Sequence, residues 1–236
     1  MNSIKLLTLS LVGVTLLGTL TGCKKDEDEE DQKPTPELGI CPDTNHPHMI
    51  DLGLPSGTKW CCCNVGASSP AAYGAFFAWG ETESKETFGW ANYSHYVNSA
   101  DAHYINIGKN IAGTKYDAAH VKLGEGWTMP TVEQIEELHM KYKSKIWTDM
   151  NGVKGLLYTG PSGAQIFFPG AGYIETSNNV TYHRNETTQT RLWTSEEYST
   201  GDEVGDNAYY MELSPSTFKK QNTIKCFGLS IRPVHK

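Results

Sequence analysis

The chain has 236 residues, with 20 lysines and arginines against 27 aspartates and glutamates and a formal net charge of −7. This length suits one ordinary domain with short extensions, and the acidic balance excludes nucleic acid as a partner, because nucleic-acid binding requires a basic face. The 23 glycines, 11 % aromatic residues and only 20 % charged residues exclude a helical bundle or coiled coil and favour a β-containing, loop-rich domain.

Residues 1–22 have the pattern of an export signal. Lys5 supplies a positive start, and an apolar stretch over residues 6–20 follows that is marginal for a bilayer span. It leads into Cys23 through the string LTGC, which resembles the lipobox of bacterial lipoproteins. The resemblance implies cleavage before Cys23, lipid attachment to Cys23 and anchoring in a membrane by several acyl chains. The alternatives are an ordinary membrane anchor or a cleaved secretory signal.

Residues 23–48 read as a spacer between the lipidated cysteine and the domain. Six consecutive acids at residues 26–31 repel one another and cannot form a core, and Pro34 and Pro36 stiffen the chain beyond them. The acidic run resembles the surface-export signals of Bacteroidota lipoproteins. It implies a lipid-anchored protein of the outer membrane that faces the cell exterior, with a periplasm-facing position as the alternative.

Residues 49–236 contain no internal repeat and no second apolar span, so we expect one domain. The clearest element is a helix over residues 132–140, where Thr131 and Gln134 have the spacing of a capping box. A shorter helix is expected over residues 117–121. The predicted apolar stripe of the longer helix consists of Val132, Ile135, Leu138 and Tyr142.

Strand-like runs occupy residues 164–168, 208–213 and 228–234, among segments punctuated by Gly, Pro, Asn and Ser. Few helices among many short strands indicate an α+β fold.

Eight separated strings then follow one another in a fixed order. They are IDLGLPSGTKW at 50–60, NVGA at 64–67, FAWGET at 77–82, DAA at 117–119, WTMPT at 127–131, FPGAGY at 168–173, LWTS at 192–195 and SIRPV at 230–234. In this order the set resembles the Fibrobacter succinogenes major paralogous domain family, and the match spans nearly the whole expected domain.

The resemblance implies a C-type-lectin-like fold, related to the sulfatase-modifying factors, with short twisted antiparallel sheets, about two helices and long loops. The family occurs mostly on secreted or surface lipoproteins, and its activity is largely undefined. Within its strings we expect four tryptophans to lie mostly in the core: Trp60, Trp79, Trp127 and Trp193.

If Cys23 carries lipid, five cysteines remain: Cys41, Cys61, Cys62, Cys63 and Cys226. Five is odd, so at least one has no intramolecular disulfide partner. A bridge from Cys41 or Cys63 to Cys226 stays open, beside buried or free thiols. Neighbouring strand residues face opposite sides, so the three consecutive cysteines cannot share one ion, and we expect no metal centre.

We expect no enzyme and no catalytic residue. The formylglycine-generating oxidases need a cysteine pair in the C-terminal half, where this chain has only Cys226. Neither a Gly-x-Ser-x-Gly elbow nor a His-Glu-x-x-His motif occurs, and His46 and His48 fall in the spacer. Ser195 is read as part of a core strand, with Glu196 and Glu197 at its solvated edge.

No cofactor is expected, with calcium as the weak exception. The acidic loop at residues 201–207 offers Asp202, Asp206 and Asn207 as oxygen ligands. The sugar-binding strings of calcium-dependent lectins are absent, so a solvated loop is the preferred interpretation.

Aromatic residues outside the family strings are the candidate contact surface, because sugar rings stack on aromatic faces and recognition usually lies on loops. They comprise Trp90, Tyr93, Tyr96 and Tyr104 in an insertion-like stretch, and Tyr173 and Tyr182 in a second polar loop. We therefore expect a non-catalytic recognition or adhesion lipoprotein that binds a glycan or a surface protein. The alternative is a structural accessory of a fimbria or surface assembly.

Overall fold

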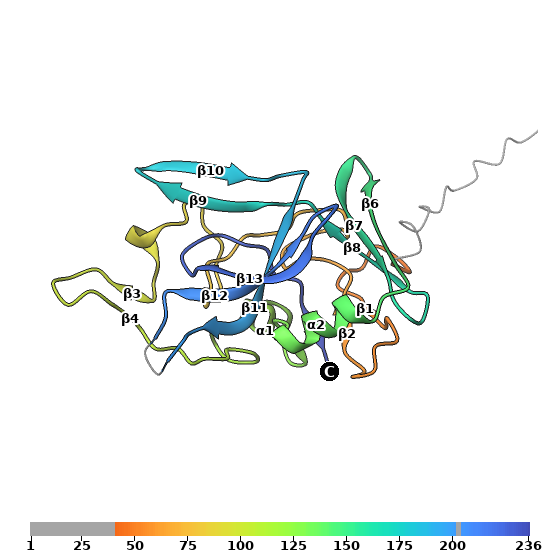
Figure 1. Ribbon diagram of the computed structural model, residues 1–236, viewed down its shortest axis with the longest axis horizontal. Coiled ribbons are helices and arrows are strands. Elements are labelled where there is room, and N and C mark those ends of the chain that lie inside the picture. The colour runs from red at the N-terminus through yellow and green to blue at the C-terminus, as the bar shows by residue number, and fades with distance from the viewer. Residues whose placement is uncertain (1–40, 202–203) are drawn as a thin grey trace, which may run out of the picture. The chain divides into compact units, whose positions relative to one another are not determined.

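The computed structural model describes residues 41–201 and 204–236 (Figure 1). The expected signal, Cys23, the acidic run and Asp202 lie outside the described residues. All described residues belong to one compact unit. Within this part of the chain, no helix is both long and apolar enough to cross a membrane.

The fold is α+β, as the sequence predicts. The described residues form the helices α1 (Ala118–Leu123) and α2 (Val132–Met140) and a single 3₁₀ turn, η2 (Trp90–Asn92). The strands are β1 (Met49–Ile50), β2 (Lys59–Cys61), β3 (Tyr96–Val97), β4 (His103–Tyr104), β5 (Trp127–Thr128), β6 (Ser144–Met150), β7 (Val153–Thr159), β8 (Gln165–Pro169), β9 (Tyr173–Ser177), β10 (Val180–Arg184), β11 (Thr190–Tyr198), β12 (Asn207–Leu213), β13 (Phe218–Ile224) and β14 (Val234–His235).

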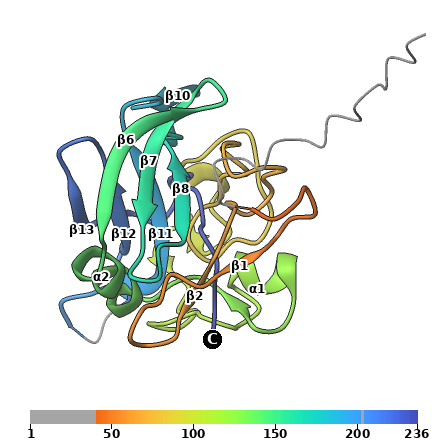
Figure 2. The same cartoon turned by 90° about the vertical axis from the view of Figure 1, so that its right-hand side faces the viewer.

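The strands pair antiparallel in small sheets. Two three-stranded sheets, β6-β7-β8 and β11-β12-β13, stand side by side in Figure 2, and β9–β10 and β3–β4 form separate hairpins. The fifth sheet is four-stranded with the order β1-β2-β14-β5, and in it Val234 lies opposite Trp60 on one side and Thr128 on the other. This last sheet joins the beginning of the domain to its end.

The four tryptophans of the family strings are buried, as predicted: Trp60, Trp79, Trp127 and Trp193. The indole N–H of Trp79 donates to the Thr194 carbonyl at 2.9 Å, and that of Trp193 donates to the Phe77 carbonyl at 2.8 Å. Most buried indoles have such a partner for the N–H, although that of Trp60 has none in the described part of the chain. The rings of Trp79 and Trp193 therefore cross-link segments more than a hundred residues apart.

The sequence prediction for α2 is confirmed at both ends. The Thr131 hydroxyl accepts a hydrogen bond from the backbone amide of Gln134, and the side-chain oxygen of Gln134 accepts one from the backbone amide of Thr131. The helix ends at Met140. Ile135 and Leu138 are buried, but Tyr142 lies beyond the helix and is 40 % exposed. Its place in the apolar stripe was wrong, because the chain leaves the helix for β6 before that residue.

The shorter predicted helix is α1, which begins one residue later than expected and extends to Leu123. The buried carboxylate of Asp117 caps it by accepting the amides of Ala119 and His120, and it also accepts the Met129 amide. Burial raises the pKa of Asp117, and these backbone donors oppose the rise.

Two of the predicted strand runs are confirmed as β8 and β12. The run over residues 228–234 is mostly irregular, with only its last residue in β14 and isolated bridges before it. The prediction of a second polar loop containing Tyr173 and Tyr182 was wrong, because this segment forms the hairpin β9–β10. Asn178 and Asn179 form its turn with φ of 50° and 61°, a pair of positive φ values that asparagine tolerates in tight hairpins.

Candidate functional site

Three of the predicted contact residues come together as one aromatic cluster, defined here as Trp90, Tyr96 and Tyr104. The Trp90 ring centroid lies 5.3 Å from that of Tyr96 and 5.4 Å from that of Tyr104, and the two tyrosine rings are 5.2 Å apart. Trp90 is 38 % exposed, and the tyrosines are half-buried. The cluster therefore offers ring surface to solvent while its rings fix one another.

Two sets of backbone contacts position the residues of the aromatic cluster. Tyr96 and Tyr104 lie opposite each other in the β3–β4 hairpin, so their side chains share a face. Trp90 begins η2, whose approach to β9 is close: Phe88 donates from its backbone amide to the Thr176 hydroxyl at 2.9 Å and accepts the Thr176 amide at 2.7 Å.

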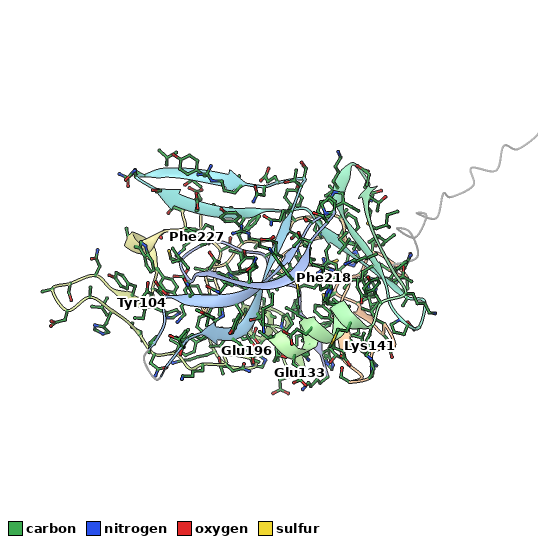
Figure 3. The ribbon with its side chains drawn as sticks, viewed as in Figure 1. Tyr104, Glu133, Lys141, Glu196, Phe218 and Phe227 are labelled. Atoms are coloured by element: carbon green, nitrogen blue, oxygen red, sulfur yellow. The ribbon has the colours of Figure 1, made fainter. Side chains whose placement is uncertain are left out.

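An open hollow of about 480 Å³ adjoins the cluster. Tyr104 and Tyr198 supply aromatic surface to it, and Ser199, Thr200 and Asp206 supply hydroxyl and carboxylate groups. Figure 3 shows Tyr104, a residue of β4, in the left part of the view, away from Glu133 and Lys141 near the two ends of α2. Because Tyr104 belongs to both features, the cluster and the hollow form one continuous surface.

A buried ion pair lies behind this surface. Lys225 Nζ is 3.2 Å from Glu197 Oε1, with the two side chains only 3 % and 2 % exposed. The ammonium also lies 4.9 Å from the Trp79 ring centroid and 5.6 Å from that of Tyr104. Burial lowers the pKa of Lys225, and the Glu197 carboxylate opposes that shift.

This ion pair corrects the prediction for the two acids after Ser195. Ser195 is fully buried in β11, as expected, but Glu197 is buried with Lys225 rather than solvated. Glu196 accepts the Val132 amide at 2.7 Å, at the start of α2. Both carboxylates therefore have structural partners inside the fold.

The remaining predicted aromatics lie apart from the cluster. Tyr93 is 3 % exposed and its hydroxyl donates to the Trp79 carbonyl at 2.8 Å, so its assignment to the contact surface was wrong. Tyr173 and Tyr182 belong to the β9–β10 hairpin. The Arg191 guanidinium lies 3.9 Å from the Tyr173 ring centroid, whereas Tyr182 is 36 % exposed.

Two of the calcium candidates can be placed. Asp206 lines the hollow. Asn207 donates from its side-chain amide to Asn222 Oδ1 at 3.0 Å, across the β12–β13 pair. The third candidate, Asp202, lies outside the described residues.

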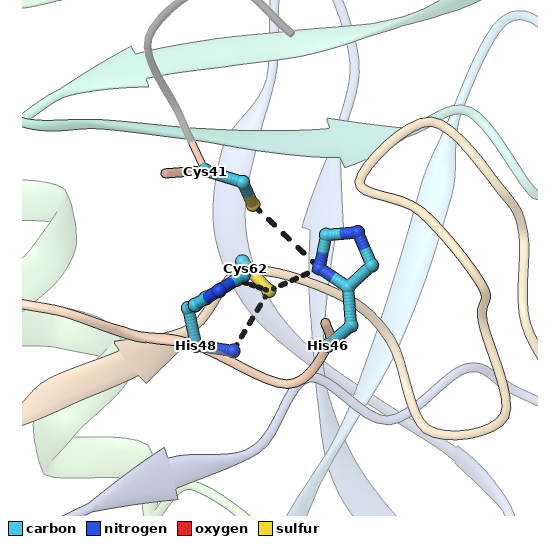
Figure 4. A group of neighbouring side chains, drawn as sticks. All are labelled: Cys41, His46, His48 and Cys62. Carbon is cyan, nitrogen blue, oxygen red and sulfur yellow. Dashed lines mark hydrogen bonds between the residues drawn. The ribbon is translucent and has the colours of Figure 1, made fainter. Parts of the chain in front are cut away.

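A second group of functional side chains was not anticipated. Cys41, His46, His48 and Cys62 bring their ligating atoms within 4.8 Å of one another. Figure 4 shows the four side chains gathered around one point. Residues 41–48 were assigned to the spacer, yet here Cys41 is buried at 5 % exposure and packs with the core of the domain. We call these four residues the Cys–His cluster.

The sulfur of Cys62 is the central acceptor of this cluster. Hydrogen bonds from the Cys41, Cys61 and Cys63 thiols lower the pKa of Cys62. Hydrogen bonding to Cys62, followed by burial, raises the pKa of Cys61 and of Cys63. Of the three consecutive cysteines, only Cys62 belongs to the Cys–His cluster. The expected separation of neighbouring side chains was wrong for Cys62 and Cys63, whose sulfurs lie 3.3 Å apart.

Arg232 fixes the backbone at Cys62. Its guanidinium is fully buried and donates to the carbonyls of Cys61, Cys62 and Phe167 and to Asn64 Oδ1, at 2.8 to 3.1 Å. Burial lowers the pKa of Arg232. These four hydrogen bonds from the guanidinium hold the backbone around Cys62 in place.

The disulfides left open in the sequence do not form with Cys226. Cys226 and Cys63 are free thiols, and Cys226 packs in a separate part of the core with Phe88 and Tyr93. Burial raises the pKa of Cys226 to about 12.

The Cys–His cluster had a signal in the sequence, the spacing Cys-x₄-His-x-His at residues 41–48. That string supplies only three ligands, and the fourth must come from three adjacent cysteines, Cys61, Cys62 and Cys63, later in the chain. The sequence does not show which of them it is, and the fold brings Cys62 to the other three ligands. Comparison of the chain with protein-family models, with curated proteins and with solved structures finds no match.

Proposed function

We propose that the protein is a surface-anchored, non-catalytic recognition lipoprotein that binds a glycan through the aromatic cluster and the hollow beside it. The observation that carries this proposal is the partly exposed Trp90 ring, which packs against two tyrosines that also contact each other, beside a polar hollow. Membrane anchoring through Cys23, an outer-membrane position and an exterior face complete the proposal, and they rest on the sequence of residues 1–31.

The chemistry of the surface matches that of a sugar. A pyranose has an apolar face that stacks on an aromatic ring and hydroxyls that require hydrogen-bonding partners. Trp90 and Tyr104 provide ring surface, and Ser199, Thr200 and Asp206 provide partners in the hollow. The volume of the hollow, about 480 Å³, is within the usual range for small-molecule sites.

The finer assignment of the fold is part of the same proposal. We assign the domain to the Fibrobacter succinogenes major paralogous family with a C-type-lectin-like fold. The support is the order of the eight strings together with the α+β architecture and the buried tryptophans of those strings.

A glycan array probed with the purified full-length chain in detergent tests the function. The wild type is compared with Trp90→Ala and with Tyr182→Ala, a control of similar exposure that lies in β10, apart from the aromatic cluster. We expect a defined set of glycans to bind the wild type and the control but not Trp90→Ala. Parallel arrays with calcium and with a chelator show whether Asp206 acts through an ion.

Two outcomes contradict the proposal. Absence of binding to every glycan rejects glycan recognition, and equal binding by wild type and Trp90→Ala rejects the aromatic cluster as its site. If no glycan binds and pull-downs from envelope extracts recover assembly subunits, the protein is instead an accessory of a surface structure.

A further inference from the structure

The Cys–His cluster lies where the first described segment meets the end of β2. Three of its members, Cys41, His46 and His48, come from within eight residues of the chain, and Cys62 follows β2 directly. Cys41 and Cys62 are buried and the two histidines are half-buried. The cluster is separate from the proposed recognition surface and does not depend on the proposed function.

The spacing of the ligating atoms matches a tetrahedral ion. His46 Nδ1 lies 3.7 Å from Cys41 Sγ and 3.3 Å from Cys62 Sγ, and His48 Nδ1 lies 3.7 Å from Cys62 Sγ. Zinc–sulfur bonds of about 2.3 Å and zinc–nitrogen bonds of about 2.1 Å at a tetrahedral angle place sulfur and nitrogen about 3.6 Å apart. The three distances lie around that value.

The second nitrogen of His48 is committed to a carboxylate. His48 Nε2 is 3.0 Å from Asp43 Oδ1, and Asp43 in turn accepts the Asn45 amide at 2.7 Å. A carboxylate at Nε2 favours the tautomer with its proton there, which leaves the Nδ1 lone pair directed at the cluster (Figure 4). Metal-binding histidines commonly have this arrangement.

Neighbouring groups also position Cys62 and favour the charged form of its sulfur. The sulfur accepts the His48 backbone amide at 3.1 Å, and Arg232 holds the Cys62 carbonyl at 2.8 Å. The amide donor stabilises negative charge on the sulfur, and the guanidinium limits movement of the chain that carries it. Two sulfurs and two nitrogens, with their supporting groups in place, form a ligand set that suits zinc.

We propose that Cys41, His46, His48 and Cys62 bind one Zn²⁺ ion in a closed tetrahedral site, with Asp43 orienting His48 from outside. On binding, the two thiols lose their protons to solvent and two zinc–sulfur bonds form, with no change of oxidation state. Four protein ligands leave no position for substrate, so the site is structural. It fastens residues 41–48, at the end of the spacer, onto the strand that ends at Cys61.

The test uses the full-length chain, purified in detergent, reduced and stripped of metal. Cobalt(II) is the first probe, because tetrahedral coordination with thiolate ligands gives intense visible absorption. We expect one cobalt per chain, its displacement by one zinc, and a rise in thermal unfolding temperature when zinc is added. Zinc affinity is then measured by competition with a chromophoric chelator.

Matched variants identify the residues. We expect His48→Ala to abolish tight zinc binding and Asp43→Ala, which keeps all four ligands, to weaken it about 10- to 100-fold. His183→Ala is the control for both, because His183 also pairs with a carboxylate, Glu186, at 3.0 Å but lies outside the cluster. Cys226→Ser is the control for a buried thiol elsewhere.

Circular dichroism establishes that each variant is folded, and Asp43→Ala tests the site even if His48→Ala fails to fold. The proposal is overturned if the folded, reduced wild type gives no tetrahedral cobalt spectrum, or if His183→Ala weakens zinc binding as much as Asp43→Ala does. It is also overturned if mass spectrometry of the chain from cell envelopes finds a Cys41–Cys62 disulfide and no zinc.

Discussion

The Cys–His cluster and the aromatic cluster each have a buried cationic side chain behind them, Arg232 and Lys225 respectively. The two cations interact with their surroundings in different ways. Arg232, behind the Cys–His cluster, donates four hydrogen bonds to neutral oxygens, two of them on the carbonyls of Cys61 and Cys62. Lys225, behind the aromatic cluster, faces one carboxylate and the rings of Trp79 and Tyr104. The planar guanidinium fixes backbone positions, whereas the ammonium supports ring faces.

The difference agrees with what each region is proposed to do. A metal ion tolerates only small displacements of its ligands, so the chain at Cys62 needs a rigid support. A stacked sugar tolerates more movement, and the aromatic cluster is correspondingly exposed. Three predictions test this contrast and a fourth concerns His139 in α2, and each is measured as a change in the free energy of unfolding.

The largest effect is expected at Arg232. Replacement by methionine leaves Asn64 Oδ1 and three buried carbonyls without their donor, and we expect a loss of about 3–5 kcal/mol in the free energy of unfolding. Urea denaturation measures it. Arg232→Lys should recover only part of the loss, because an ammonium cannot reach all four oxygens. A loss below about 1 kcal/mol for methionine would show that the guanidinium is not the support we infer.

A smaller loss is expected for Lys225→Met, about 2–3 kcal/mol. The variant leaves Glu197 buried without its cation, although Glu197 still accepts the Gly205 amide. Adding Glu197→Gln should restore much of the stability, since the uncompensated charge is then removed. If the double variant is as unstable as the sum of both single variants, the two side chains are not coupled.

Trp90→Ala should reduce the free energy of unfolding by only about 1 kcal/mol, because the ring is partly exposed and its main contacts are two aromatic pairs. Denaturant unfolding beside the Tyr182→Ala control measures the difference. A loss as large as that of Lys225→Met would place Trp90 in the folding core rather than on a binding surface.

The smallest effect concerns acid, and it is expected at His139 in α2. Burial, followed by the charge of Lys145, lowers the pKa of His139 from 6.5, and its ring stacks on Phe218 at 4.4 Å. As the pH falls below 6.5, the unfolded chain takes up this proton before the folded one, so stability falls.

Metal-stripped wild type and His139→Gln are therefore compared by urea denaturation at neutral pH and at about pH 5.5. We expect the variant to lose less stability than the wild type over this interval. Equal losses would assign the acid sensitivity to other groups.

Local signals in the sequence were sufficient for some elements and not for others. The capping box at Thr131 and Gln134 is contained in four residues, so α2 could be placed within its true ends. The β9–β10 hairpin depends on two asparagines with positive φ, and its second strand, β10, is polar and largely exposed, so it lacks the alternation that marks a buried face. It was therefore mistaken for a loop.

The candidate regions show the same limit. Composition and position suggested Trp90, Tyr96 and Tyr104, but Tyr93, only three residues from Trp90, is buried in the core with the distant residues Ile174 and Cys226. Cys62 meets Cys41 only because β1 and β2 pair and return the chain to the segment before β1. Contacts of this range follow from the tertiary fold and could not be derived from spacing alone.

The most direct measurement of the recognition claim is calorimetric titration of the strongest array ligand into wild type, Trp90→Ala and Tyr182→Ala. The account predicts that Trp90→Ala weakens the affinity at least about tenfold, or about 1.4 kcal/mol, while Tyr182→Ala binds like the wild type. Unchanged affinity in Trp90→Ala, or an equal loss in Tyr182→Ala, would contradict recognition through the aromatic cluster.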